Sequence, residues 1–181
     1  MCFQFKTKIT SIQSESIIIL KEFVAKIFTD KKFEDESDRC FISEEQVSDN
    51  ASEQLLFIRK KTARLNEKIK EVLSSVLNKN TDYIQDNYIT LRSGRYVIPV
   101  KTEFKNKVKG MLHDQSSSGA TVYIEPEQVV ELNNELKLLE IKEKEETEKI
   151  LRAFTDKIRE AAAELSTNNI LLIKADIAFA K

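Results

Sequence analysis

The chain has 181 residues, which is enough for one ordinary domain or two small units with a buried core. Charged residues make up 33% of it and apolar residues 41%, with only three Gly, two Pro and no Trp, so a loop-rich fold is excluded and long helices are favoured. Lys and Arg number 29 and Asp and Glu 30, a formal net charge of -1. Attraction to a polyanion therefore requires basic residues gathered in one region.

Two features bear on the cellular location of the protein. Cys2 and Cys40 are far apart and form neither a metal knuckle nor a dense disulfide framework, so we expect a reduced, cytoplasmic environment. The longest aliphatic run, from Ile17 to Leu20, is much shorter than a membrane span or a signal peptide requires. We therefore expect a protein that neither contacts a membrane nor is exported.

The first fifty residues carry weak signals. Apolar residues recur at spacings of three and four from Ser11 to Phe28, which predicts an amphipathic helix, while residues 1–10 show little pattern. The acidic stretch that follows contains several residues that favour helix caps. We expect a short helix near 31–39 and then a turn or a small hairpin.

A stronger pattern begins near Asn50 and predicts a helix over 52–79, with Ser52 as a possible N-cap. Its positions alternate at spacings of three and four, as in the seam of a helix that packs against a second helix. These positions are Leu55, Ile58, Thr62, Leu65, Ile69, Val72 and Val76.

The period changes after Asn80, where short β-rich runs begin. Two of these runs flank Ser93-Gly94, a dipeptide that suits a tight hairpin, and Pro99 predicts an edge strand or a bulge. A second pair of strands, VKGMLHDQ and ATVYIEP, is joined by a serine-rich loop. We expect a small antiparallel β unit over 83–125.

A second long helix is predicted over 126–165. Pro126 stands where a first-turn proline belongs, and the chain from there to Leu165 contains neither Gly nor another Pro. The middle of this helix, KEKEETEK at 142–149, is charged on every side, so either solvent surrounds it or a partner outside the chain covers it. The caps offered by Ser166 to Asn169 predict a break before a last helix.

The run GMLHDQSSSGAT places the only histidine, an aspartate and three serines together. We expect no catalytic residue here, because a GxSxG elbow is absent and His113 and Asp114 would point to opposite faces of a strand. The absence of GxxxxGK argues against a nucleotide P-loop, and one histidine with two distant cysteines gives no basis for a metal site. We expect a hairpin loop with Gly119 at positive φ, from which hydroxyls could contact an anion. Those hydroxyls belong to Ser116, Ser117 and Ser118.

Basic residues are concentrated just upstream of that run. Positions 92–109 hold six basic residues and one acidic residue, a local net charge of +5 in a chain that is otherwise slightly acidic. Such segregation suits contact with a nucleic-acid backbone, because neutralised phosphates release counterions. The alternative is a solvated lysine fringe that protects strand edges from aggregation. The candidate contacts are Arg92, Arg95, Lys101, Lys105, Lys107 and Lys109.

The motifs GRYVIPVK, HDQSSSGAT, IEP and VELNNEL, in this order, resemble the MutS-two branch of the bacterial MutS family, which lacks the mismatch-reading domain. VSDNASEQLLFIRKKTARLNEKIKEVL is also similar to the start of that branch's lever helix, so the resemblance covers roughly residues 38–181. The expected fold is mainly α with a small antiparallel β unit, carried on long antiparallel lever helices. The resemblance implies core helices over 1–51, an outgoing lever helix over 52–82, a clamp-like β tip over 83–125, a returning lever helix over 126–165 and a core helix over 166–181.

The resemblance also implies that the chain is an internal fragment of a dimeric DNA-binding ATPase. The ATPase domain, which uses ATP and Mg²⁺, would follow residue 181, and the family's nuclease activity belongs to a C-terminal domain, so we expect no catalysis and no cofactor in the chain itself. The expected role is a nucleic-acid-contacting module that relays binding of branched DNA or ribosomal RNA to the ATPase, in a protein that restrains recombination or rescues collided ribosomes. The alternative is a structural dimerisation arm without direct nucleic-acid contact.

Overall fold

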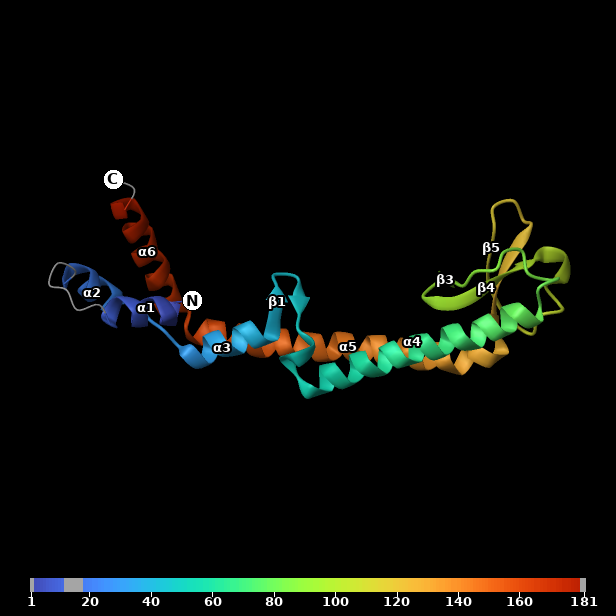
Figure 1. The fold of residues 1–181 in the computed structure, drawn as a ribbon, viewed down its shortest axis with the longest axis horizontal. Coiled ribbons are helices and arrows are strands. Elements are labelled where there is room, and N and C mark those ends of the chain that lie inside the picture. Colours follow the sequence, from blue (N-terminus) through green and yellow to red (C-terminus); the bar gives the residue numbers. More distant parts are fainter. Residues whose placement is uncertain (1, 12–17, 180–181) are drawn as a thin grey trace. The chain divides into compact units, whose positions relative to one another are not determined.

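The computed structural model describes residues 2–11 and 18–179 and divides the chain into two compact units. One unit comprises residues 1–53 with 147–181, and the other comprises residues 54–146. The helices are α1 Cys2–Ser11, α2 Ile18–Ala25, α3 Lys31–Cys40, α4 Glu53–Lys79, α5 Glu127–Glu160 and α6 Ala162–Phe179 (Figure 1). The strands are β1 Phe41–Ser43, β2 Gln46–Val47, β3 Thr90–Arg92, β4 Arg95–Lys101, β5 Gly110–Gln115 and β6 Thr121–Pro126. The expected fold class, mainly helical with a small antiparallel sheet, is confirmed.

The sheet of the 54–146 unit has the strand order β3-β4-β6-β5, and all neighbouring strands are antiparallel. Strands β3 and β4 form the predicted hairpin around Ser93 and Gly94, whose φ angles of 51° and 73° suit a two-residue turn. Strands β5 and β6 form the second predicted hairpin, and Gly119 supplies a φ of 74° in its loop. Residues 102–109 cross from β4 to β5 and include the short 3₁₀ helix η3 Thr102–Phe104.

The expectation that Pro99 marks an edge strand or a bulge is wrong. Pro99 lies in β4, an interior strand in regular register with β6. Its carbonyl faces away from β6 and accepts a hydrogen bond of 3.1 Å from the Gln85 amide, beyond the point where β3 begins. The missing N–H of Pro99 lies on that same side, so the proline removes no ladder hydrogen bond.

The core of the 54–146 unit lies between the sheet and the helices α4 and α5. Helix α4 begins one residue later than expected, and five of its seven seam positions are buried, while Thr62 and Val72 are half-buried. Strands β4 and β6 contribute Ile98, Val100, Val122 and Ile124 to the same core, and α5 contributes Val129, Leu136 and Leu139. The predicted pairing of α4 with a second helix is confirmed.

Ion pairs join the exposed flanks of α4 and α5. Lys61 Nζ lies 2.6 Å from Glu135 Oε1, and this hydrogen bond lowers the pKa of the Glu135 carboxyl. Arg59 Nε lies 2.7 Å from Glu143 Oε1, in the charged stretch 142–149. That stretch is otherwise mostly exposed in this chain.

The sequence suggests that Pro126 lies in the first turn of the long second helix, but the structure places it before α5. It is the last residue of β6, opposite Gly110, and α5 begins at Glu127. A Cβ at Gly110 would lie 2.1 Å from the Glu125 carbonyl oxygen, so β5 can approach β6 here only with glycine.

In the other unit, the predicted helix near 31–39 is confirmed as α3, and the small hairpin that follows is β1–β2. The Asp30 carboxylate caps α3 by accepting a hydrogen bond of 3.1 Å from the Phe33 amide. The buried ring of Phe154 packs against Phe33 at 5.2 Å and against Phe41 at 4.8 Å between ring centroids. Helix α3 and the hairpin are thereby joined to α5 residues of the same unit.

The helix expected over Ser11 to Phe28 is seen in part. Helix α2 covers Ile18–Ala25, and residues 12–17 lie outside the described part of the chain. Helix α1 forms where the sequence shows little pattern. No described helix is long and apolar enough to cross a membrane.

The boundary between the last two helices was predicted at the wrong place. Helix α5 ends at Glu160, and α6 runs without a break through Ser166 to Asn169. The Thr167 hydroxyl donates to the Ala163 carbonyl at 2.9 Å, and the Asn168 amide bonds Phe28, so these side chains leave the helical backbone intact.

Candidate nucleic-acid interface

The six basic candidates fall into two groups in the structure. Arg92, Arg95 and Lys101 bond to other parts of the protein, and their side chains are half-buried. The other three side chains are exposed and have no ion-pair partner among the described residues. This second group consists of Lys105, Lys107 and Lys109.

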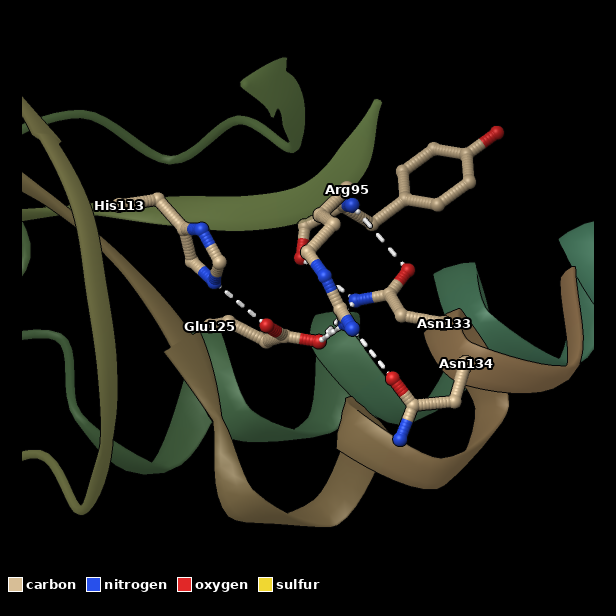
Figure 2. Close-up of polar contacts among 6 residues, drawn as sticks. Arg95, His113, Glu125, Asn133 and Asn134 are labelled. Atoms are coloured by element: carbon tan, nitrogen blue, oxygen red, sulfur yellow. Dashed lines mark hydrogen bonds and ion pairs between the residues drawn. The ribbon is translucent and has the colours of Figure 1, made fainter. Parts of the chain in front are cut away.

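Arg95 belongs to a polar network around Glu125, whose side chain is 0% exposed (Figure 2). Glu125 Oε1 accepts hydrogen bonds from Arg95 Nη1 at 2.6 Å and from Asn133 Nδ2 at 2.8 Å. Glu125 Oε2 lies 2.5 Å from His113 Nε2, and Arg95 also donates to Asn134 Oδ1. A buried carboxylate is tolerated only with such partners, so Arg95 acts here as an internal counter-ion.

Asn133 connects this network to the sheet. Its Oδ1 accepts a hydrogen bond of 3.2 Å from the Tyr96 amide, and its Nδ2 donates at 3.1 Å to the Tyr96 carbonyl (Figure 2). The side-chain amide therefore replaces a neighbouring strand beside β4, at the level where β6 ends at Pro126. The start of α5 is thus fastened to β4 by a helix side chain.

Arg92 lies over an aromatic ring and is only partly exposed to solvent. Its guanidinium carbon is 4.0 Å from the centroid of Tyr123, and its Nε is 3.1 Å from Asp114 Oδ2. Its Nη1 also donates to Leu91 O and Thr90 Oγ1. The charge of Arg92 is therefore largely compensated within the sheet.

Lys101 is held at the end of β4. Its Nζ donates to the Asp82 carbonyl at 3.0 Å and lies 6.0 Å from the ring centroid of Phe104. A carbonyl oxygen does not neutralise an ammonium group, so Lys101 keeps its charge but has a fixed position.

The three exposed lysines share a well-anchored crossover between β4 and β5. Val108 is buried in the core of the unit, between Lys107 and Lys109. The Lys107 amide donates to the Phe104 carbonyl at 2.8 Å, and the Lys109 carbonyl accepts from the Glu127 amide at 3.2 Å. The backbone of the crossover is thus fixed while its lysine side chains remain free to contact a ligand.

The serine-rich loop is a hairpin loop, as expected, and most of its hydroxyls are used internally. Ser116 Oγ accepts from the Thr121 amide at 3.1 Å and lies 3.3 Å from Ser118 Oγ. Ser117 is exposed. Ser118 is also exposed, but its hydroxyl contacts Ser116 Oγ and the Ala120 amide, so Ser117 is the serine of this loop whose exposed hydroxyl has no partner among the described residues.

His113 and Asp114 point to different partners, as their adjacent positions in β5 predict. His113 contacts Glu125, and Asp114 contacts Arg92, with a register shift of the β5–β6 pair between Leu112 and Asp114. Neither side chain forms a hydrogen bond with the serines of the loop among the described residues. The described contacts therefore contain no Ser-His-Asp relay of the kind that a serine hydrolase uses.

Sequence reasoning assigned no role to Glu125, Asn133 or Asn134. A usable signal was present, because Asn133 stands in the apolar stripe of α5, four residues after Val129 and three before Leu136. A polar residue at a core position requires a buried hydrogen-bond partner. That requirement pointed to a polar contact with the sheet.

Comparison with known proteins identifies relatives that share one name. No protein-family model matches the chain. Three similar relatives carry the name Endonuclease MutS2. The protein from Agathobacter rectalis is 50% identical over 149 residues, which are 81% of this chain and 19% of the relative. Those from Caldanaerobacter subterraneus and Alkaliphilus oremlandii are 42% identical over 92% and 98% of this chain, and over 21% and 23% of the relatives. The chain thus spans about a fifth of the length of these relatives.

Proposed function

This chain is a MutS2-like protein, and from that premise we propose that its 54–146 unit contacts nucleic acid through Lys105, Lys107 and Lys109. The observation that carries the proposal is the anchored crossover with three exposed lysines that have no ion-pair partner among the described residues. Lysine ammonium groups on a fixed backbone neutralise phosphates and release counterions. Lys101, at the end of the adjoining strand, adds a fourth positive charge.

The proposed role includes transmission as well as contact. We propose that α4 and α5 form the lever pair and that the sheet is the clamp-like part, with the remaining helices in a core. The supporting observation is the buried network of Arg95, Glu125 and Asn133, which fastens the sheet to α5. We propose that displacement of the sheet is transmitted to α5 through this network.

The activities of the longer protein are part of the same proposal. We propose that nucleic-acid contact by this unit regulates an ATPase domain, which would use ATP and Mg²⁺, in a homodimeric protein. The proposed targets are branched DNA or ribosomal RNA, in restraint of recombination or rescue of collided ribosomes. We propose that this chain itself carries no catalysis, and that the nuclease activity in the relatives' name belongs to other parts of those proteins.

Charge reversal at the crossover tests the contact. In the intact protein, changing Lys105, Lys107 and Lys109 to Glu should weaken binding to junction DNA or structured RNA by more than tenfold at moderate salt. The slope of log K against log salt should fall in magnitude by about 2 to 3, because three phosphate contacts are lost. Salt titrations by fluorescence anisotropy measure both quantities.

The matched control reverses three exposed lysines on the helices of the same unit. Changing Lys60, Lys68 and Lys142 to Glu alters the net charge by the same amount but leaves the crossover intact. This control should keep the affinity within about twofold. Equal losses in the two triple variants would show that only the overall charge matters, and unchanged binding in the crossover variant would refute the contact.

A structural dimerisation arm is the alternative function. Five of the seven seam residues of α4 are buried within the chain, so most of the seam is not available to a second subunit. The observation that favours the alternative is the set of exposed apolar side chains on α6, Ile170, Leu172, Ile173 and Ile177. The crossover variant separates the two functions, because a nucleic-acid contact should lose affinity, whereas a dimerisation arm should keep both its affinity and its oligomeric state, which light scattering measures.

A further inference from the structure

A cluster of planar side chains joins strands β3, β5 and β6. Tyr123, on β6, is almost fully buried and carries the Arg92 guanidinium at 4.0 Å. Tyr88, just before β3, is hydrogen-bonded through its phenol to Tyr123, and this bond raises the pKa of Tyr88. Tyr88 is 42% exposed and the Arg92 side chain 33% exposed, so both side chains are accessible to a ligand.

These two groups are held in place before any ligand binds. Arg92 is fixed by Asp114, by the Leu91 carbonyl and by Thr90. Tyr88 is held through its backbone, because its amide donates to the Asp86 carbonyl at 2.9 Å. Planar groups that are already ordered lose little entropy when a second planar group stacks on them.

We propose that Tyr88 and Arg92 form a stacking platform for unpaired nucleobases. This inference rests on the proposed function and names its substrate class, namely nucleic acid with single-stranded or extruded bases beside the bound backbone. Tyrosine rings and arginine planes are the side-chain surfaces on which unpaired bases stack, whereas bases inside a duplex present only their edges.

The charges in the unit support this occupant. Arg92 is neutralised by Asp114, so it is a weak phosphate ligand and its exposed face is better suited to stacking. The uncompensated charges that a polyanion requires lie on the crossover, at Lys105, Lys107 and Lys109.

Binding of a single strand and of a duplex tests the platform. The intact protein is titrated with a 12-nucleotide single strand that contains 2-aminopurine and with a duplex of the same length. Tyr88→Ala should weaken binding of the single strand by about 5- to 100-fold, the range that loss of one base stack typically causes, and should leave the duplex within about twofold. The 2-aminopurine fluorescence should be quenched on binding to the wild type and less quenched with the variant.

Two control variants separate stacking from other effects. Tyr88→Phe keeps the ring and removes the hydroxyl, so it should retain most of the single-strand affinity. Phe57→Ala removes an aromatic ring from α4 that is 61% exposed and should change neither affinity. Thermal unfolding of each variant confirms that it is folded, which is expected because neither Tyr88 nor Phe57 is buried.

The outcomes distinguish this inference from the proposed function. If the crossover charge reversal weakens both ligands while Tyr88→Ala weakens neither, or weakens both equally, the platform is refuted and the lysine contact stands. If the charge reversal leaves all binding unchanged, the proposed lysine contact fails. Selective loss of single-strand binding in Tyr88→Ala, with Tyr88→Phe near wild type, is the result that we expect.

Discussion

Each unit of the chain contains a buried asparagine that bonds both backbone groups of one residue, but the two asparagines differ in what else they contact. Asn133 bonds the amide and carbonyl of Tyr96 in the 54–146 unit, and Asn168 bonds those of Phe28 in the other unit at 2.8 and 2.7 Å. Both are almost completely buried. Asn133 is also bonded to Glu125, whereas Asn168 bonds no charged side chain in the described part of the chain.

The same hydrogen-bonding arrangement of an asparagine side chain therefore serves two purposes. In both units a helix side chain satisfies backbone groups that lack a regular partner, which avoids the cost of burying them unpaired. Only in the 54–146 unit does the same amide also hold a buried carboxylate and, through it, Arg95 and His113. The joint between sheet and α5 therefore depends on a charge network, and the joint beside Phe28 depends on neutral hydrogen bonds.

The largest expected effect comes from removing the counter-ion of this network. Arg95→Ala should lower the free energy of unfolding by about 3 to 5 kcal/mol, because it leaves the Glu125 carboxylate buried with only neutral partners or His113. Urea unfolding followed by circular dichroism measures the change. The matched control is Arg92→Ala, whose partner Asp114 is about half exposed, and it should cost about 1 kcal/mol or less. Similar losses in the two variants would contradict a special role for the Glu125 network.

The next largest losses of stability are expected when each of the two asparagines is replaced by alanine. Asn133→Ala removes hydrogen bonds to Tyr96 and Glu125 and should cost about 2 to 4 kcal/mol, whereas Asn168→Ala removes only those to Phe28 and should cost about 1 to 3 kcal/mol. Unfolding curves of the two variants at equal temperature give the comparison.

A double change sharpens the same comparison. Arg95 and Asn133 share Glu125 Oε1, so the losses in the double variant Arg95→Ala, Asn133→Ala should be smaller than the sum of the single losses. Arg95→Ala combined with Asn168→Ala should be additive, because the two residues belong to different units and share no hydrogen-bond partner among the described residues. Additivity in both pairs would show that the network does not act as a unit.

The sequence predicted the features that depend on local patterns. The seam of α4, the Ser93-Gly94 turn and the loop closed by Gly119 all follow from spacing or from residues with special backbone freedom, and the structure confirms them. The α5–α6 boundary was missed because serine, threonine and asparagine favour caps only when their side chains are not otherwise bonded, and Asn168 is bonded to Phe28. Local pattern cannot reveal a partner that is 140 residues away.

The same limit explains why the sequence did not show which basic residues of the candidate site have ion-pair partners. Counting charges between 92 and 109 treats six basic residues alike, but Arg95 pairs with Glu125 and Arg92 with Asp114, two acidic residues beyond that window. Pairing across strands depends on the register of β5 with β6, which composition does not contain. The described ion pairs leave the charges of Lys101, Lys105, Lys107 and Lys109 uncompensated, and the last three of these lysines are exposed.

The smallest expected effect concerns a buried polar group that lacks the partners the two asparagines have. Thr62 lies in the seam of α4, and its hydroxyl is buried with no hydrogen-bond partner among the described residues. Thr62→Val replaces this hydroxyl by a methyl group of similar size and should raise the free energy of unfolding by about 1 kcal/mol, because an unsatisfied buried hydroxyl is lost. Thr62→Ser, which keeps the hydroxyl and loses the methyl group, should be neutral or destabilising in the same urea titration. A loss of stability in Thr62→Val would mean that the hydroxyl is satisfied in solution, and Thr62 would then resemble Asn133 and Asn168 instead of contrasting with them.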